Sequence, residues 1–219
     1  MIIEVTNIGL LLSKKNNHKN WRDKMKQIEI TGRVNETLDE ATNKLEKCGF
    51  KKIRESRIED TYLTQKYKEL SKNNILQVLS SCVLLRYLKV NNDQVIRKIT
   101  YKNKIYDGNQ VISEEKINLN CDDLDEAFEL FKALKFEKIV DVKYDVLVMA
   151  KGNIEFAFQN VENLGLLVEY ENLNDFDGKS NEEILGEKKK MIAELKSYGL
   201  DITDEFDVKK AYELILKSL

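Results

Sequence analysis

The tetrapeptide Leu38-Asp39-Glu40-Ala41 returns 86 positions later (38 to 124) as Leu124-Asp125-Glu126-Ala127. At the same offset, Phe50-Lys51-Lys52-Ile53 returns as Phe136-Glu137-Lys138-Ile139. Two matches that share one offset indicate an internal repeat. The first match lies in a stretch with the apolar spacing of a helix, and the second opens a strand-like stretch. The sequence therefore predicts two strand–helix–strand units.

The first unit opens at residues 27–33, where polar and apolar residues alternate. This alternation predicts a strand with Ile28 and Ile30 on one face. The other face is polar and carries Gln27, Glu29, Thr31 and Arg33. A helix follows, because Thr37 and Glu40 form a capping box and Gly49 is placed to end it.

The other segments predict more strands and two C-terminal helices. Residues 83–90 and 95–102 predict one hairpin, residues 146–150 and 154–158 predict another, and residues 166–171 predict a further strand. A capping box of Ser180 and Glu183 begins a helix that Gly199 ends, and Asp207 is expected to cap the last helix. The fold class is therefore α+β. We expect one compact domain over residues 25–219, with residues 1–24 as an N-terminal appendage that need not belong to it.

Composition excludes several classes of function. With 36 Lys and Arg against 38 Asp and Glu, the net charge is −2, so no global basic field favours nucleic acid or an anionic membrane. The apolar run Ile8–Leu12 is too short to cross a membrane. Cys48, Cys82 and Cys121 form no C-x-x-C pair, which makes a reducing cytoplasm the default location. A single His18 excludes catalysis by a serine triad or a multi-histidine metal site.

Several predicted strands carry charged residues on one face and apolar residues on the other. One interpretation is a sheet with a solvated face. The alternative is a barrel whose charged faces line a tunnel while helices cover its apolar exterior. Acids at positions i and i+2, such as Glu169 and Glu171, suit Mg²⁺ or Mn²⁺, and basic residues from other strands suit the phosphates that share the ion.

In this arrangement the chain resembles the CYTH superfamily, the triphosphate tunnel proteins that include class IV adenylate cyclases and thiamine triphosphatases. The motifs that carry the resemblance are Gln27–Thr31 against E-x-E-x-K, Glu59–Tyr62 against D-T-Y, Leu85–Leu88 against L-R-x-R, Thr100–Lys102 against T-x-K, Val161–Glu171 against V-x-x-L-G-x-F-x-E-I-E, and Lys209–Leu214 against R-S-Y-x-x-L-L. These motifs span about residues 25–217, and the run at 161–171 is the most specific of them.

The resemblance implies a closed, antiparallel eight-stranded β-barrel with helices packed outside, which binds a triphosphate together with Mg²⁺ or Mn²⁺. The implied metal ligands are Glu29, Glu169 and Glu171. The implied triphosphate ligands are Arg33, Arg57, Arg86, Lys102 and Lys143, of which Lys102 and Arg86 would also be catalytic.

The sequence departs from the family pattern at Gln27, Thr31, Leu88 and Gln159, and Asp141 and Asp145 flank Lys143. Three hypotheses therefore stand. The chain is an enzyme that cyclises or hydrolyses a nucleoside, organic or inorganic triphosphate, it binds a nucleotide or polyphosphate without turnover, or it is a scaffold for a protein partner. The sequence leaves a homodimer open.

Overall fold

The computed structural model describes residues 28–91, 94–107, 110–172, 174, 176 and 178–219. Eight strands dominate the described chain: β1 (Ile28–Arg33), β2 (Lys51–Thr64), β3 (Ser81–Val90), β4 (Gln94–Asp107), β5 (Gln110–Asn120), β6 (Glu137–Lys151), β7 (Ile154–Val161) and β8 (Gly165–Asn172). The helices are α1 (Leu38–Lys47), the short 3-10 turn η1 (Tyr67–Glu69), α2 (Ile75–Leu79), α3 (Leu124–Ala133), α4 (Asn181–Ser197) and α5 (Lys210–Ser218).

The internal repeat is confirmed. Helix α1 begins at Leu38 and α3 at Leu124, and strands β2 and β6 begin at Lys51 and Glu137, so both pairs keep the offset of 86 (38 to 124, 51 to 137). The two repeated strands pair with each other in antiparallel fashion, and Ile58 lies directly opposite Tyr144, its own equivalent in the repeat. The repeat therefore builds a local twofold arrangement at the centre of the sheet.

Both predicted capping boxes are present. The Thr37 hydroxyl accepts from the Glu40 amide while the Glu40 carboxylate accepts from the Thr37 amide, and Ser180 and Glu183 repeat the arrangement at α4. The prediction for α5 was wrong by two residues (208 to 210), because the helix begins at Lys210 with Lys209 as its N-cap and not directly after Asp207. Asp207 forms a parallel bridge with Thr31 of β1, so this segment is still extended.

The strands form one antiparallel sheet in the order β1-β8-β7-β6-β2-β3-β4-β5. Within the described residues no pairing joins β5 to β1, so the prediction of a closed barrel is not confirmed. The second edge of β1 instead meets the segment between α4 and α5. The Thr31 amide donates to the Phe206 carbonyl at 3.0 Å, and the Val208 amide donates to the Thr31 carbonyl at 3.0 Å. This segment satisfies backbone groups that a neighbouring strand would otherwise pair.

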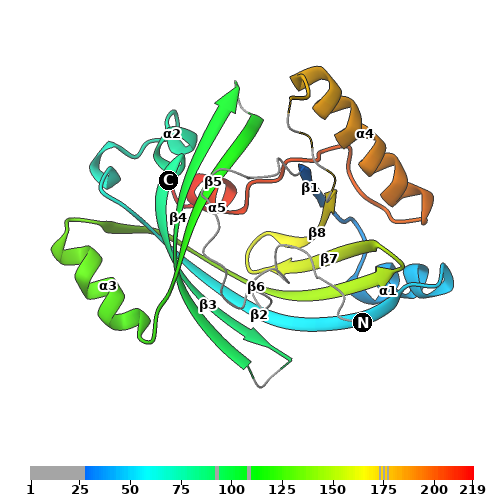
Figure 1. Cartoon of the computed structure of the whole chain (residues 1–219), viewed down its shortest axis with the longest axis horizontal. Coiled ribbons are helices and arrows are strands. Elements are labelled where there is room, and N and C mark those ends of the chain that lie inside the picture. The colour runs from blue at the N-terminus through cyan, green and yellow to red at the C-terminus, as the bar shows by residue number, and fades with distance from the viewer. Residues whose placement is uncertain (1–27, 92–93, 108–109, 173, 175, 177) are drawn as a thin grey trace.

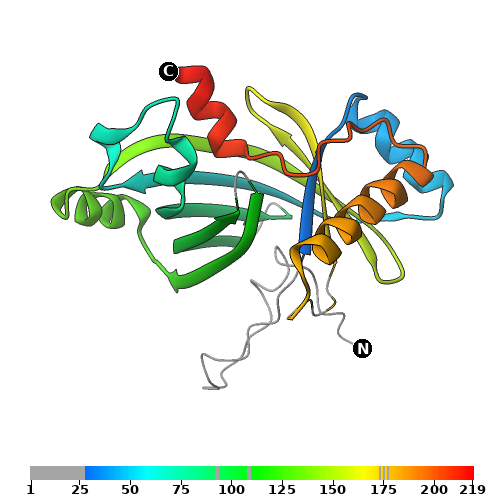
Figure 2. The same cartoon turned by 90° about the horizontal axis from the view of Figure 1, so that it is seen from above.

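The sheet curves around α5, which lies on its concave side between β4–β5 and β8–β1 (Figure 1). We define the concave face by Ile58, Tyr144, Val146 and Leu167, which pack with residues of α2 and α5 in one core cluster. On the convex face, α1 and α4 cover one end of the sheet and α3 covers the other (Figure 2). The central part of the convex face, between these helices, is where β2 and β6 present polar side chains.

Some sequence expectations concern termini and cysteines. The predicted appendage, residues 1–24, lies outside the described residues. None of Cys48, Cys82 and Cys121 forms a disulfide bond within the described residues. In the part of the chain that the structure describes, no helix has both the length and the apolar composition that a membrane crossing requires.

Candidate functional site

The three predicted metal ligands share the concave face of β1 and β8. Glu29 lies directly opposite Glu171, and Thr31 lies opposite Glu169. Residues directly opposite in an antiparallel pair project to the same side of the sheet, as do residues i and i+2 of one strand. Because Leu167 belongs to the concave core, Glu169 and Glu171 project to that side as well. The predicted grouping of these acids is therefore present at the level of the sheet.

Lys210, the first residue of α5, reaches this group of acids. Its ammonium donates to Oε1 of Gln159, whose Nε2 donates to Oε2 of Glu169 at 2.7 Å. The same ammonium lies 3.8 Å from Oε2 of Glu169 and 4.5 Å from the ring centroid of Tyr144. Gln159 is only 1% exposed. The glutamine that departs from the family motif thus connects an acid of β8 to the base of α5.

The electrostatics keep Lys210 charged and Tyr144 neutral. Burial alone would lower the pKa of Lys210, but interactions with Tyr144, Glu169 and Glu29 outweigh it, and the net pKa is raised. Burial raises the pKa of Tyr144, and this outweighs the opposing effect of Lys210. The concave face therefore carries a fixed ammonium at its centre.

A second polar group lies on β2, β3 and β4. Arg86 donates from Nε and Nη2 to the two carboxylate oxygens of Asp60, each at 2.6 Å, and Asp60 is 3% exposed. Burial opposes the charge of Arg86, but Asp60 outweighs it, so the pKa of the guanidinium is raised. This bidentate geometry fixes both side chains.

Lys98 lies directly opposite Arg86 on β4 and is 8% exposed. Burial lowers its pKa, and the neighbouring charge of Arg86 lowers it further. Lys98 has no carboxylate partner among the residues that the structure describes. Lys102 lies four positions further along the same face of β4, opposite Cys82. Arg86, Lys98 and Lys102, which we call the basic row, thus place three cations on one side of two adjacent strands.

Arg33 also projects to the concave side but is engaged by α5. Its Nη2 donates to both carboxylate oxygens of Glu213, at 2.7 and 2.8 Å, and its Nη1 donates to the Leu164 carbonyl at 3.3 Å. The predicted phosphate ligand therefore anchors the C-terminal helix to β1 and β8.

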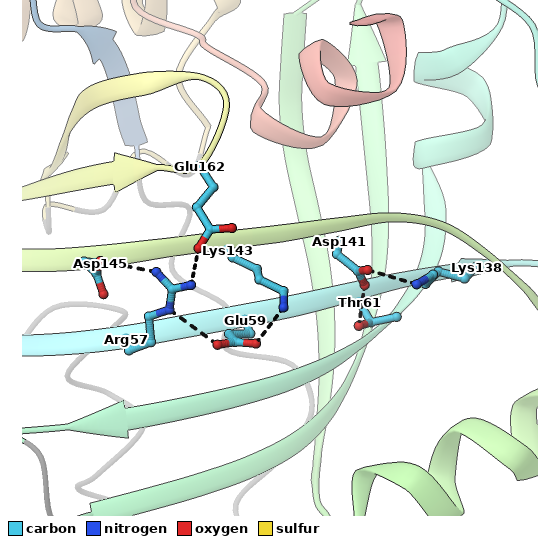
Figure 3. Close-up of polar contacts among 8 residues, drawn as sticks. All are labelled: Arg57, Glu59, Thr61, Lys138, Asp141, Lys143, Asp145 and Glu162. Carbon is cyan, nitrogen blue, oxygen red and sulfur yellow. Dashed lines mark hydrogen bonds and ion pairs between the residues drawn. The ribbon is translucent and has the colours of Figure 1, made fainter. Parts of the chain in front are cut away.

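Arg57 and Lys143 were predicted as triphosphate ligands, and the structure corrects this prediction (Figure 3). Both residues neighbour the Ile58–Tyr144 pair in sequence, and successive strand residues project to opposite faces, so both lie on the convex face. Arg57 contacts Asp145 at 3.2 Å, Glu59 at 3.4 Å and also Glu162, while Lys143 contacts Glu59 at 3.3 Å. Neither residue shares a site with Glu29 or Arg86.

The predicted ligand set did not include Lys210, Lys98 or Asp60. Lys210 and Asp60 lie inside motifs that resemble the family, at 209–214 and 59–62, so their positions in those motifs were the available signal. Lys98 shares the face of Lys102 because the two are four residues apart on one strand. Gln27, which was expected beside Glu29, lies outside the described residues.

The acids do not form a ready metal centre. Among the described residues, no three His, Cys, Asp or Glu side chains are arranged to hold a metal ion. Glu169 already accepts a hydrogen bond from Gln159 and faces the ammonium of Lys210. Since Mg²⁺ requires close oxygen ligands in near-octahedral geometry, this donor set does not fit a resident ion as it stands. We derive no chemical step through such an ion.

Comparisons with known proteins place this geometry in context. No protein-family profile matches the chain. A Methanocaldococcus jannaschii protein named "Putative adenylate cyclase MJ0240" is 24% identical over 190 residues, which cover 86% of this chain and 97% of that protein. The PH1819 protein of Pyrococcus horikoshii superposes with a TM-score of 0.65 at 22% identity, covering 88% of this chain and 99% of that one.

A third similar protein is HpAC1 from Hippeastrum, described as a "putative adenylyl cyclase" that reveals a dominant triphosphatase activity. It superposes with a TM-score of 0.54 at 12% identity and covers 88% of this chain and 96% of that one. The chain therefore has the fold of these cyclase-like proteins. The names of two of these three proteins are consistent with the CYTH resemblance that the sequence motifs carry.

Proposed function

We propose that this chain binds a nucleoside, organic or inorganic triphosphate on the concave face of its sheet. The observation that carries the proposal is the basic row, because Lys98 is almost fully buried beside Arg86 and has no carboxylate partner in the described chain. A buried cation without an anion is unfavourable, and a phosphate oxygen would supply the missing charge. The M. jannaschii relative and the HpAC1 structure, both of which carry cyclase names, support the same ligand class.

In this proposal Arg86, Lys98 and Lys102 meet the phosphates, and Lys210 lies beside the acids of β8. Each charge-assisted hydrogen bond to a phosphate oxygen is worth about 1.5–3 kcal/mol. A divalent ion, Mg²⁺ or Mn²⁺, would enter as part of the metal–triphosphate ligand, with Glu29, Glu169 and Glu171 as the nearest predicted carboxylates. Such an ion neutralises phosphate charge.

A second candidate function is turnover of the bound triphosphate, either by cyclisation of ATP with release of pyrophosphate or by hydrolysis. This candidate is favoured by the triphosphatase activity described for HpAC1 and by the name of the M. jannaschii relative. Against efficient turnover, two of the five predicted phosphate ligands, Arg57 and Lys143, lie on the opposite face, and Arg33 and Arg86 already have acidic partners. Arg86 and Lys102 would stabilise charge on the reacting phosphates.

Phosphorus NMR tests both candidates. Inorganic tripolyphosphate and ATP are each mixed with a stoichiometric amount of the protein, with Mg²⁺ and then with excess chelator, and followed over time. Shifted and broadened signals that persist indicate a binder, pyrophosphate from ATP indicates a cyclase, and orthophosphate indicates a hydrolase. Unchanged spectra under every condition would refute triphosphate binding.

A matched pair of variants tests the site assignment. Lys98→Met removes a cation of the basic row, whereas Lys89→Met removes a lysine of the same hairpin that pairs opposite Arg57 on the convex face. We expect Lys98→Met to lose about 10- to 100-fold in tripolyphosphate affinity. Equal affinities in the two variants would show that the basic row does not hold the phosphates.

A further inference from the structure

Arg54 is a buried arginine of β2 with unsatisfied hydrogen-bond donors. It is 8% exposed, and its Nε and Nη2 atoms are buried without a hydrogen-bond partner in the described chain. The hydroxyl of Ser56, two residues along the same strand face, is also buried and without a partner there. Two orphaned donors therefore lie side by side on β2.

Both residues project to the concave face. Arg54 lies opposite Val148 and Ser56 lies opposite Val146, and both valines belong to the concave core. The row that begins at Arg54 continues through Val148 and Ala157 to Glu169. Arg54 therefore shares a face with the acids of β8 and with the basic row.

The charge of Glu155 offsets the effect of burial on Arg54 only in part. Burial lowers the pKa of the guanidinium, and the carboxylate of Glu155 on β7 raises it again by charge alone. No ion pair joins Arg54 to an acid among the described residues. A guanidinium in such surroundings destabilises the free protein and favours an anion that can accept from Nε and Nη2 together.

We propose that Arg54 and Ser56 form a second anion subsite on the concave face, which binds a phosphate or carboxylate group outside the triphosphate itself. Arg54 lies six residues from Asp60 on one strand, which corresponds to roughly 20 Å along the backbone. The basic row begins beside Asp60, so the two sets of donors meet different parts of a ligand. The inference rests on the proposed function only for the identity of that ligand.

The test uses one variant, Arg54→Met, that is expected to raise the melting temperature of the free protein and to lower its affinity for an anion. In Arg54→Met the orphaned charge is gone, so we expect the free protein to melt about 2–6 °C higher than wild type. The same variant should lose about 10- to 100-fold in affinity for a longer linear polyphosphate, measured by calorimetry, while its affinity for tripolyphosphate changes little. Arg54→Lys, which keeps the charge, should recover part of the lost affinity.

Arg57→Met is the matched control, because Arg57 lies on the same strand but on the convex face and has three acidic partners. It should not melt above wild type and should bind both polyphosphates normally. Melting wild type and Arg54→Met in inorganic phosphate and in acetate distinguishes the two anion sources: the anion that stabilises wild type but not the variant identifies the group that Arg54 takes.

An Arg54→Met protein that melts at or below the wild-type temperature, fails to fold, or keeps full affinity for the longer polyphosphate would overturn the subsite. Failure of the proposed function has a different signature. In that case wild type does not bind tripolyphosphate, yet Arg54→Met still melts higher and still loses its stabilisation by phosphate or acetate.

Discussion

Arg54 and Arg57 lie three residues apart on β2, yet their surroundings are opposite. On the convex face, Arg57 contacts Asp145, Glu59 and Glu162, so its charge is neutralised within the protein (Figure 3). On the concave face, Nε and Nη2 of Arg54 have no partner in the described chain. The charged side chains of the convex face pair with one another near solvent. The concave face includes cations whose charge an anionic ligand would neutralise. Strand β2 thus carries structural charge, which protein side chains neutralise, on its convex face. On its concave face it carries binding charge, which a ligand would neutralise.

The largest effect should come from breaking the buried ion pair of Arg86 and Asp60 on the concave face. Arg86→Met leaves Asp60, which is 3% exposed, without its bidentate partner. Removing one member of a buried ion pair costs about 3–5 kcal/mol because the other charge remains buried. We expect a loss of that size in the free energy of unfolding, measured by urea denaturation.

A variant that lacks both charges shows whether the stability lost in Arg86→Met comes from the unpaired buried carboxylate or from lost packing. The double variant Asp60→Leu with Arg86→Met should recover most of the stability lost in Arg86→Met, because two apolar side chains replace the pair. It should nevertheless bind tripolyphosphate more weakly than wild type. A single variant that loses under about 1 kcal/mol would show that the pair is not a buried one in solution.

The next effect concerns the ammonium at the centre of the concave face. Lys210→Met keeps the length of the side chain but removes the charge that contacts Gln159 and lies 3.8 Å from Glu169. We expect a 10- to 100-fold lower affinity for tripolyphosphate, measured by calorimetry. Lys209→Met is the control, since Lys209 pairs with Asp207 at 2.5 Å and lies outside the Gln159 contact. Equal losses in both variants would argue for a general charge effect.

A smaller effect is a pH dependence that only the concave face should show. Burial, and then Arg86, lower the pKa of Lys98 below the ordinary lysine value of 10.5. Between the lowered pKa and 10.5 the unfolded chain binds more protons than the folded one, so the contribution of Lys98 to stability rises with pH in that window. Tripolyphosphate affinity should fall in the same window, because Lys98 loses its charge.

Wild type and Lys98→Met are compared by urea denaturation and by tripolyphosphate binding as the pH is raised toward 10.5. Subtracting the two profiles removes the contribution of other lysines and of tyrosines. A difference profile that is flat in both measurements would contradict the assignment of Lys98 to the buried basic row.

Much of the fold could be predicted from local patterns. The repeat offset of 86 relates the start of α1 to that of α3 and the start of β2 to that of β6 (38 to 124, 51 to 137). The capping boxes at Thr37 and Ser180 correctly predicted two helix starts. These features depend on residues that are close in sequence. Closure of the barrel could not be predicted in the same way, because it depends on whether β1 pairs with β5 or with residues 201–208, about 170 positions away (31 to 207).

The same difference between local patterns and distant contacts explains why only part of the site could be predicted. Glu169 and Glu171 lie in a strand with clear alternation, so their common face could be read directly from sequence. Lys143 was predicted from the family resemblance and not from strand alternation. Its neighbour Tyr144 lies on the concave face, so Lys143 projects to the convex one. Lys210 reaches the site from a helix, and no strand periodicity reports that contact.

The smallest effect should come from the convex face itself. Arg57→Met removes three contacts, but Arg57 is 28% exposed and its partners Asp145 and Glu162 are 64% and 51% exposed, so water can replace the lost charge. Pairs of this kind contribute about 0–1 kcal/mol each, and we expect the free energy of unfolding to fall by about 1 kcal/mol. The loss should shrink in high salt, because exposed charges are screened.

Since Arg57 lies on the face opposite to Glu29, Arg86 and Lys210, tripolyphosphate affinity should not change. A clear loss of affinity in Arg57→Met would mean that the ligand reaches the convex face, and the separation of structural charge from binding charge on β2 would fail.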